Sequence, residues 1–180
     1  MTPSTDVLEG LLFLEEADFP TFYSPGAKRR AIELADIAKN SVHFLDEFFE
    51  NKVQNRLLVL SEEDWNKRLE YQYGQIAGID NFLWYPEVKE DNPIFEKLIP
   101  YHQNSPEDIR QELVRLLGDR KSPFLYSLLR WFEVLTVHEF CHNYNRENGV
   151  SIKLKWFDEL FCDYFTYASL KRYEKENPDD

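Results

Sequence analysis

The sequence is poor in cysteine and has no long apolar run. Two cysteines in 180 residues cannot form a disulfide framework, which favours a reducing compartment. The apolar run at residues 11–14 is too short for a signal core or a membrane span, and no basic residue precedes it. No internal repeat or low-complexity linker divides the chain. We therefore expect one cytoplasmic domain over residues 1–180, with residues 1–17 and 176–180 at its periphery.

Basic residues are also scarce. The chain has 21 lysines and arginines against 33 acidic residues, which gives a net charge of −12. An acidic surface repels phosphate backbones and anionic lipids, so we expect neither nucleic acid nor membranes among the partners. The acidic residues are spread along the chain rather than gathered in a tail. We interpret them as a solubilising surface.

Hydrophobic spacing and turn residues predict a mixture of strands and helices. Apolar runs at residues 18–23, 56–60 and 79–85 predict strands, and Pro86 after the last run favours an edge position in the sheet. Capping residues at Ser61 and Ser105 mark helix starts. Helices are predicted over residues 27–49, 62–69, 106–117, 123–147 and 156–175, whereas residues 8–14 fit either type. The chain is thus expected to be an α+β protein.

The most specific pattern is an HExxH motif, His138-Glu139-Phe140-Cys141-His142. Residues four apart in a helix lie on one face, so both imidazoles can reach a single metal ion. Glu139 lies beside that face, where it can hold a metal-bound water. The apolar positions 124, 128, 132 and 135 continue into the two histidines at helical spacing. We expect this stripe to lie in the core and to place both histidines at its end.

The last predicted helix offers a third ligand. A catalytic zinc takes three protein ligands and keeps a fourth position for water. Glu159 can supply the third if this helix packs antiparallel against the helix of the HExxH motif. Asp163, one turn later on the same face, can accept a hydrogen bond from the free ring nitrogen of a ligand histidine. Glu139 would then act as the general base.

An HExxH helix followed by a helix with Glu159-x-x-x-Asp163 resembles the gluzincin branch of zinc metallopeptidases, which includes thermolysin and the neutral zinc aminopeptidases. Trp156-x-x-Glu159 also resembles a signature of their compact peptidase MA-like domains. Residues 19–25 and 57–65 are similar to segments of those domains as well, so the resemblance covers residues 18–172.

The resemblance implies a zincin-like fold, with helices packed on a small twisted mixed sheet and the HExxH motif in the active-site helix. It implies a zinc-dependent peptide-bond hydrolase in which His138, His142 and Glu159 bind Zn²⁺, Glu139 activates the metal-bound water and Asp163 orients a ligand. A peptide or protein substrate would then lie along the predicted edge strand at residues 79–85.

The chain departs from the family at the residue that stabilises the transition state. In the family this tyrosine or histidine lies well beyond the glutamate ligand, and no residue here matches it. Tyr164, Tyr167 and His102 are the candidates that the sequence offers for this role.

Two other interpretations remain open. One is a non-catalytic zincin-like domain that binds a partner peptide and keeps zinc as a structural or regulatory element. The other is an acidic helical protein without metal, in which His138 and His142 are partly buried helix residues. Cys141 and Cys162 lie within the two zinc segments, and we interpret them as buried core residues rather than as ligands or a disulfide.

Overall fold

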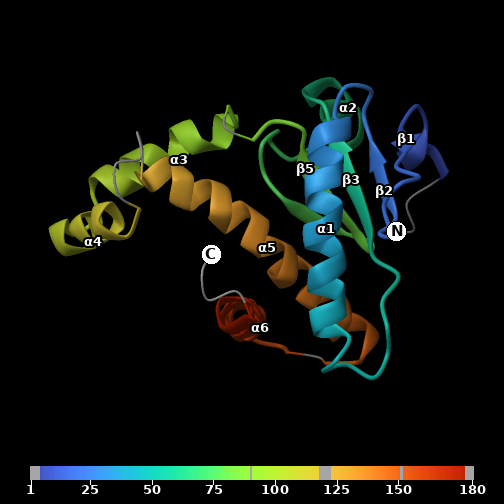
Figure 1. Ribbon diagram of the computed structural model, residues 1–180. Helices are drawn as coiled ribbons and strands as arrows, with labels where there is room; N and C mark the ends of the chain where they lie inside the picture. Colours follow the sequence, from blue (N-terminus) through green and yellow to red (C-terminus); the bar gives the residue numbers. More distant parts are fainter. Residues whose placement is uncertain (1–4, 90, 118–122, 151, 177–180) are drawn as a thin grey trace.

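The computed structural model describes residues 5–89, 91–117, 123–150 and 152–176, and these residues form an α+β fold (Figure 1). Within them are six α-helices and a mixed sheet of five strands, which confirms the predicted class. A 3₁₀ turn at Thr5–Leu8 precedes the sheet. The strands are β1 (Leu12–Phe13), β2 (Thr21–Tyr23), β3 (Arg56–Leu60), β4 (Ala77–Ile79) and β5 (Phe82–Pro86). The helices are α1 (Lys28–Leu45), α2 (Glu62–Arg68), α3 (Pro93–Gln103), α4 (Glu107–Leu117), α5 (Pro123–Glu147) and α6 (Lys155–Glu176).

The sheet has the strand order β1-β2-β3-β5-β4. The three central strands are parallel to one another, and the two outer strands pair antiparallel with their neighbours. Side chains of β3 alternate between two cores, as the pleat of a strand requires. Leu57 and Val59 join the core that contains α1 and α5, whereas Leu58 and Leu60 pack with Trp65 of α2. The prediction of a buried strand at residues 56–60 is confirmed.

The predicted edge strand at residues 79–85 is wrong. Asp80 and Asn81 have φ angles of 49° and 65°, and they form a two-residue turn between β4 and β5. The hairpin places β5 inside the sheet, so β4 is the strand at the edge. Aspartate and asparagine adopt left-handed backbone more readily than most residues, and this pair is the sequence signal for the turn.

Helix α3 was not predicted, although its start carries ordinary signals. Asn92 Oδ1 accepts a hydrogen bond from the Ile94 N–H at 3.0 Å, and Pro93 occupies the first helical position. Pro100 lies inside the helix, where proline is normally unfavourable, and it weakens the helical signal of this segment. Together α3 and α4 form an arm that stands away from the sheet (Figure 1).

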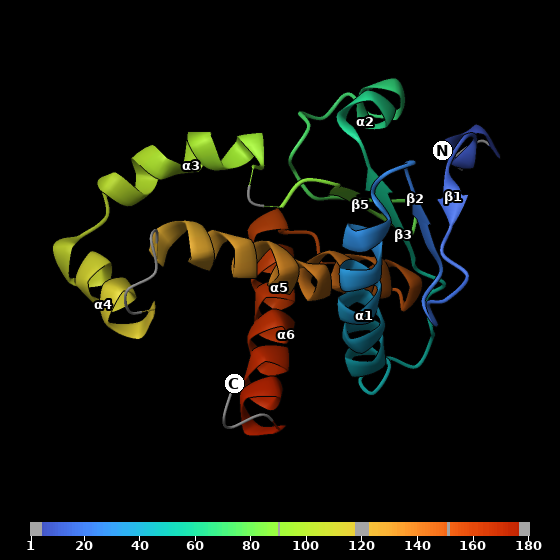
Figure 2. The same ribbon diagram turned by 45° about the horizontal axis from the view of Figure 1, so that its top comes forward.

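The HExxH motif lies in α5, a helix of 25 residues that crosses the molecule beside α1. Helix α6 crosses α5 steeply in both views, rather than lying antiparallel to it as we expected (Figures 1 and 2). One side of α5 is already covered by the core around α1, where Phe140 and Tyr144 are fully buried. The first turns of α6 therefore meet the HExxH segment on the remaining side.

The apolar stripe of α5 does not lie in the core as predicted. Phe132 and Leu135 are partly exposed, and they line a groove bounded by α3, β4 and α5. The side chain of Phe124 lies outside the described residues. Helix α5 is sandwiched between neighbours, so a different set of its residues faces α1 and the sheet. That set is Val137, Phe140, Cys141 and Tyr144.

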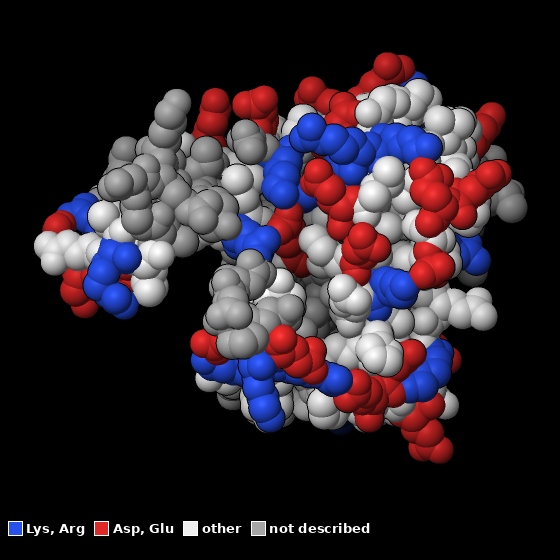
Figure 3. Space-filling view, viewed as in Figure 1, with Lys and Arg blue, Asp and Glu red and all other residues white. Residues whose placement is uncertain are grey.

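Acidic and basic side chains lie next to each other over much of the face in Figure 3. The structure contains exposed ion pairs such as Lys28–Glu16 and Lys39–Asp18. Among the described residues, none of the helices combines the length and the apolar character of a transmembrane span.

Candidate metal centre

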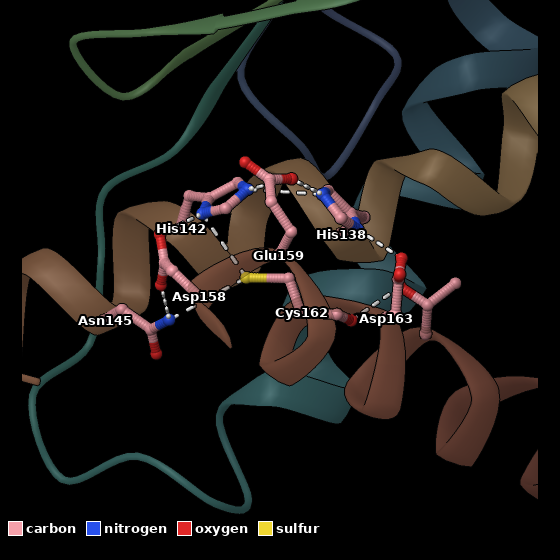
Figure 4. Close-up of polar contacts among 8 residues, drawn as sticks. His138, His142, Asn145, Asp158, Glu159, Cys162 and Asp163 are labelled. Carbon is pink, nitrogen blue, oxygen red and sulfur yellow. Dashed lines mark hydrogen bonds and ion pairs between the residues drawn. The ribbon is translucent and has the colours of Figure 1, made fainter. Parts of the chain in front are cut away.

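Three side chains converge where α5 and α6 cross (Figure 4). His138 Nε2 lies 3.2 Å from His142 Nε2 and 3.2 Å from Glu159 Oε2. The third separation, between His142 Nε2 and Glu159 Oε2, is 3.6 Å. The structure therefore brings together the three residues that were predicted as metal ligands, and it does so through one donor atom from each.

These separations fit a tetrahedral zinc ion. With zinc–nitrogen and zinc–oxygen distances of about 2.0–2.2 Å, two ligand atoms in a tetrahedral site are about 3.4 Å apart. The three separations of 3.2, 3.2 and 3.6 Å lie around this value. Two imidazole nitrogens and one carboxylate oxygen are also a donor set that catalytic zinc sites use. The residues present thus fit the metal in both spacing and chemistry.

A carboxylate lies behind each imidazole. Asp163 Oδ1 is 3.0 Å from His138 Nδ1, and Asp158 Oδ2 is 3.1 Å from His142 Nδ1. An ionised carboxylate can only accept hydrogen bonds, so each Nδ1 donates and carries the proton. In the neutral rings both Nε2 atoms then present lone pairs toward each other and toward Glu159. Three facing lone pairs repel one another unless a proton or a metal ion lies among them.

Asp163 was predicted to orient a ligand histidine, whereas Asp158 was missed. Asp158 is held in turn by Asn145, whose Nδ2 donates to its Oδ1 at 3.1 Å. The steep crossing of the two helices explains the omission, because in an antiparallel arrangement the residue before Glu159 would point away from α5. The sequence alone gives no signal for Asp158; in the structure Asp158 and Cys162, one helical turn apart, both contact His142.

The surroundings of His142 favour a positive charge. The hydrogen bond with Cys162, together with the charges of Asp158 and Glu139, raises the pKa of His142 to about 9. Cys162 itself remains a neutral thiol, because its contact with Cys141 and its burial raise its pKa. Because the thiol is neutral, the negative charge that attracts a proton or a metal ion to the His142 ring comes from the carboxylates.

Cys162 lies on the Nδ1 side of the His142 ring, away from the ligand triangle. Cys162 Sγ is 3.4 Å from His142 Nδ1, not from Nε2. His142, Asp158 and Cys162 are close enough to form a second group of possible ligands. This group would use Nδ1 and require a thiolate, whereas burial holds the thiol neutral. Both cysteines are free and fully buried, as expected for core residues.

Glu139 faces the edge strand rather than the ligand triangle itself. Burial raises the pKa of its carboxyl group, while the nearby His138 and His142 oppose that rise. The Gly78 N–H of β4 hydrogen-bonds with Glu139, and a Cβ at position 78 would lie only 2.8 Å from Glu139 Oε2. The carboxylate of the candidate general base thus lies between the HExxH helix and the edge strand β4.

Two of the three candidates for transition-state stabilisation, Tyr164 and Tyr167, have exposed side chains rather than side chains buried in this cluster. Both lie on α6, and the Tyr167 ring packs beneath the Lys171 ammonium at 5.9 Å. The side chain of His102 lies outside the described residues.

Comparisons with protein families, with curated proteins and with solved structures find no match for this chain. Its function is therefore to be inferred from its own residues.

Proposed function

We propose that the chain is a zinc-dependent peptide-bond hydrolase of the gluzincin type. The observation that carries this proposal is the triangle of His138, His142 and Glu159 donor atoms, with separations of 3.2, 3.2 and 3.6 Å. A carboxylate behind each ring, from Asp163 and Asp158, adds the second feature of an ordered zinc site.

Each residue of the cluster has a distinct role in the proposed reaction. A bound zinc ion supplies Lewis acidity that polarises the scissile carbonyl and makes a water molecule more acidic. Glu139 accepts a proton from the attacking water and later donates it to the leaving amine. Its burial suits this role, because desolvation raises its pKa above that of an exposed glutamate. Asp158 and Asp163 hold the rings in the tautomer that leaves both Nε2 atoms free.

The zincin-like fold is part of the same proposal. The sheet is mixed, and its antiparallel edge strand β4 contacts the HExxH helix α5. Helix α6 then contributes Glu159 from the next element of the chain. An edge strand beside the candidate catalytic residue gives an extended peptide a place to add by main-chain hydrogen bonds.

The alternative is a non-catalytic domain that binds a peptide along β4 around a structural zinc. This alternative is supported by the exposure of Tyr164 and Tyr167 on α6. Because of it, no side chain is assigned to stabilise the oxyanion. Glu139 speaks against this alternative, because a structural zinc needs no buried carboxylate beside its ligands.

Metal content and peptide cleavage together test the proposal. Protein purified without a histidine tag should contain about one zinc per chain. His142→Ala should lose most of that zinc, whereas His43→Ala, which removes an exposed histidine of α1, should keep it. Glu139→Gln should retain the fold and the zinc and lose cleavage of a peptide library by about 100- to 10,000-fold. Wild-type protein without zinc would refute the proposal, and zinc-loaded protein that cleaves no peptide would favour the alternative.

A further inference from the structure

A second cavity, of about 320 Å³, lies between α1, α5 and α6. Its volume is at the lower end of the range of about 300–1,000 Å³ that is usual for ligand pockets, so it suits a small molecule. The residues that line it are different from those of the candidate metal centre. Its apolar lining residues are Ile37, Val134, Val137, Leu170 and Tyr173.

This cavity has a buried floor and an apolar rim. Val137 of α5 and Thr166 of α6 are buried. Leu170 and Tyr173, further along α6, are 43% and 50% exposed, so large apolar side chains stay in contact with water beside the cavity. A ligand with an apolar body would cover them and remove them from water. A concave apolar surface of this kind is typical of a binding site.

A carboxylate with three cations lies at one end of the cavity. Glu133 Oε1 is 2.8 Å from Lys89 Nζ and 3.2 Å from Arg30 Nη1. Arg130 Nη1 approaches the other oxygen, Oε2, at the longer distance of 3.5 Å. Both Glu133 and Arg130 line the cavity, and along α5 they precede its apolar residues. Arg130 is therefore the cation that the cavity presents to a ligand.

The charge of Arg130 is not needed to balance the neighbouring acids. Lys89 is the closest partner of Glu133, and the second acid of this network, Glu33, pairs with Arg30 at 3.1 Å. Each acid thus has a cation of its own before Arg130 is counted. The Arg130 side chain is also 56% exposed, so its guanidinium is accessible. An uncompensated positive charge at the end of an apolar cavity attracts an anionic group.

We propose that this cavity binds a small carboxylic acid with an apolar body, whose carboxylate pairs with Arg130 while the body lies between α1, α5 and α6. A guanidinium has five N–H donors in one plane, so it can contact Glu133 on one side and a ligand carboxylate on another. An amine is repelled by Arg130, and an uncharged head group gains a weaker hydrogen bond. The inference goes beyond the proposed function and does not depend on it.

The head-group preference can be measured by isothermal titration calorimetry with octanoate, octanol and octylammonium. These probes share one apolar chain and differ only in the group that would meet Arg130. We expect octanoate to bind about tenfold tighter than octanol, which is the lower end of what a hydrogen bond to a charged group contributes, because Arg130 is partly exposed. Octylammonium should bind more weakly than octanol. Each titration is made on protein as purified and again after treatment with a chelator, since a carboxylate can also bind to a zinc ion.

Two arginine variants locate the anionic end of the ligand. Arg130→Gln removes the charge at the cavity and should lower the affinity for octanoate to that for octanol, with the affinity for octanol unchanged. Arg115→Gln is the matched control. Arg115 is also an exposed helix residue that pairs with a glutamate three positions away, but it lies on α4 and does not line the cavity. It should keep the preference for octanoate.

A cavity-filling variant locates the apolar end. Val134→Phe places a larger side chain in the cavity and should abolish binding of both octanoate and octanol. Thermal unfolding and circular dichroism show whether this variant is folded. If it is not, Leu170→Asp takes its place, because position 170 is at the exposed rim and a carboxylate there should repel octanoate.

The outcomes separate this inference from the proposed function. A preference for octanoate that is lost in Arg130→Gln and kept in Arg115→Gln supports the inference, whether or not the protein cleaves peptides. Equal affinity for octanoate and octanol, absence of binding, or a preference that survives Arg130→Gln overturns it. A preference that is present only before chelation also overturns it, because octanoate would then be bound to the metal. The proposed function is judged separately, by zinc content and peptide cleavage.

Discussion

Removing the carboxylates behind the two imidazoles should weaken zinc binding while leaving all three proposed ligands in place. Losing such an acceptor costs about 10- to 100-fold in metal affinity, or ~1.4 to 2.7 kcal/mol. The Asp163 side chain is 53% exposed, so water can replace it beside His138, and we expect about a tenfold loss for Asp163→Ala. The Asp158 side chain is 30% exposed and is tied to Asn145, so Asp158→Ala should lie higher in that range.

Zinc affinity is measured by competition with a chromophoric chelator, and thermal unfolding shows whether each variant keeps its fold. Asp36→Ala is the matched control, because it removes the same charge from an exposed position on α1. If the Asp158 and Asp163 variants bind zinc as tightly as the Asp36→Ala control, the reasoning is refuted. The rings would then be oriented without help from either carboxylate.

Two further predictions concern catalysis and stability. Gly78→Ala should lower kcat about tenfold with little change in zinc content, because the new methyl group displaces the Glu139 carboxylate. Steady-state kinetics and metal analysis check this, and an unchanged kcat would contradict it. Glu133→Gln should lower the free energy of unfolding by about 2 kcal/mol at pH 7, since it breaks the buried pair with Arg30 and the pair with Lys89. Burial opposes the ionisation of Glu133, but these two cations outweigh it and lower its pKa. The stabilisation is therefore fully present above the unfolded-state pKa of about 4.3, and it is lost as the pH falls through the lower folded-state pKa. Urea unfolding should show a difference at pH 7 that shrinks as the pH is lowered through the folded-state pKa, and a difference independent of pH would count against this assignment.

The cluster at the centre of the site was predictable because its spacing is local. His138 and His142 are one helical turn apart, and so are Glu159 and Asp163, which means that each helix presents a pair on one face. The structure places all four together at the crossing of α5 and α6. That they bind zinc and that Glu139 catalyses hydrolysis stay predictions.

The features that were missed depend on how helices pack rather than on their periodicity. The crossing angle of α5 and α6 decides whether Asp158 reaches His142, and no pattern within either helix encodes that angle. Phe132 and Leu135 illustrate the same limit, because the sequence pattern of an apolar stripe is the same whether it lines a core or a groove. The contact between Gly78 and Glu139 joins residues that are distant in the chain, so it could only be seen in three dimensions.

The predicted strand at residues 79–85 failed for a local reason. The left-handed turn at Asp80 and Asn81 lies inside an otherwise apolar run, and two short strands were taken for one. By contrast, the helix start at Ser61 was predicted correctly, since its Oγ accepts the Asp64 N–H at 3.2 Å. A cap depends on a few neighbouring residues alone, so it can be predicted without knowledge of the fold.

X-ray absorption at the zinc edge, on protein loaded with one equivalent of zinc, tests the central claim most directly. The arrangement of His138, His142 and Glu159 predicts a four-coordinate ion with nitrogen and oxygen neighbours at about 2.0–2.2 Å. Glu159→Ala should remove one oxygen neighbour or abolish tight binding. A sulfur neighbour at about 2.3 Å would instead place the ion at Cys162, and failure to bind zinc at all would contradict the account.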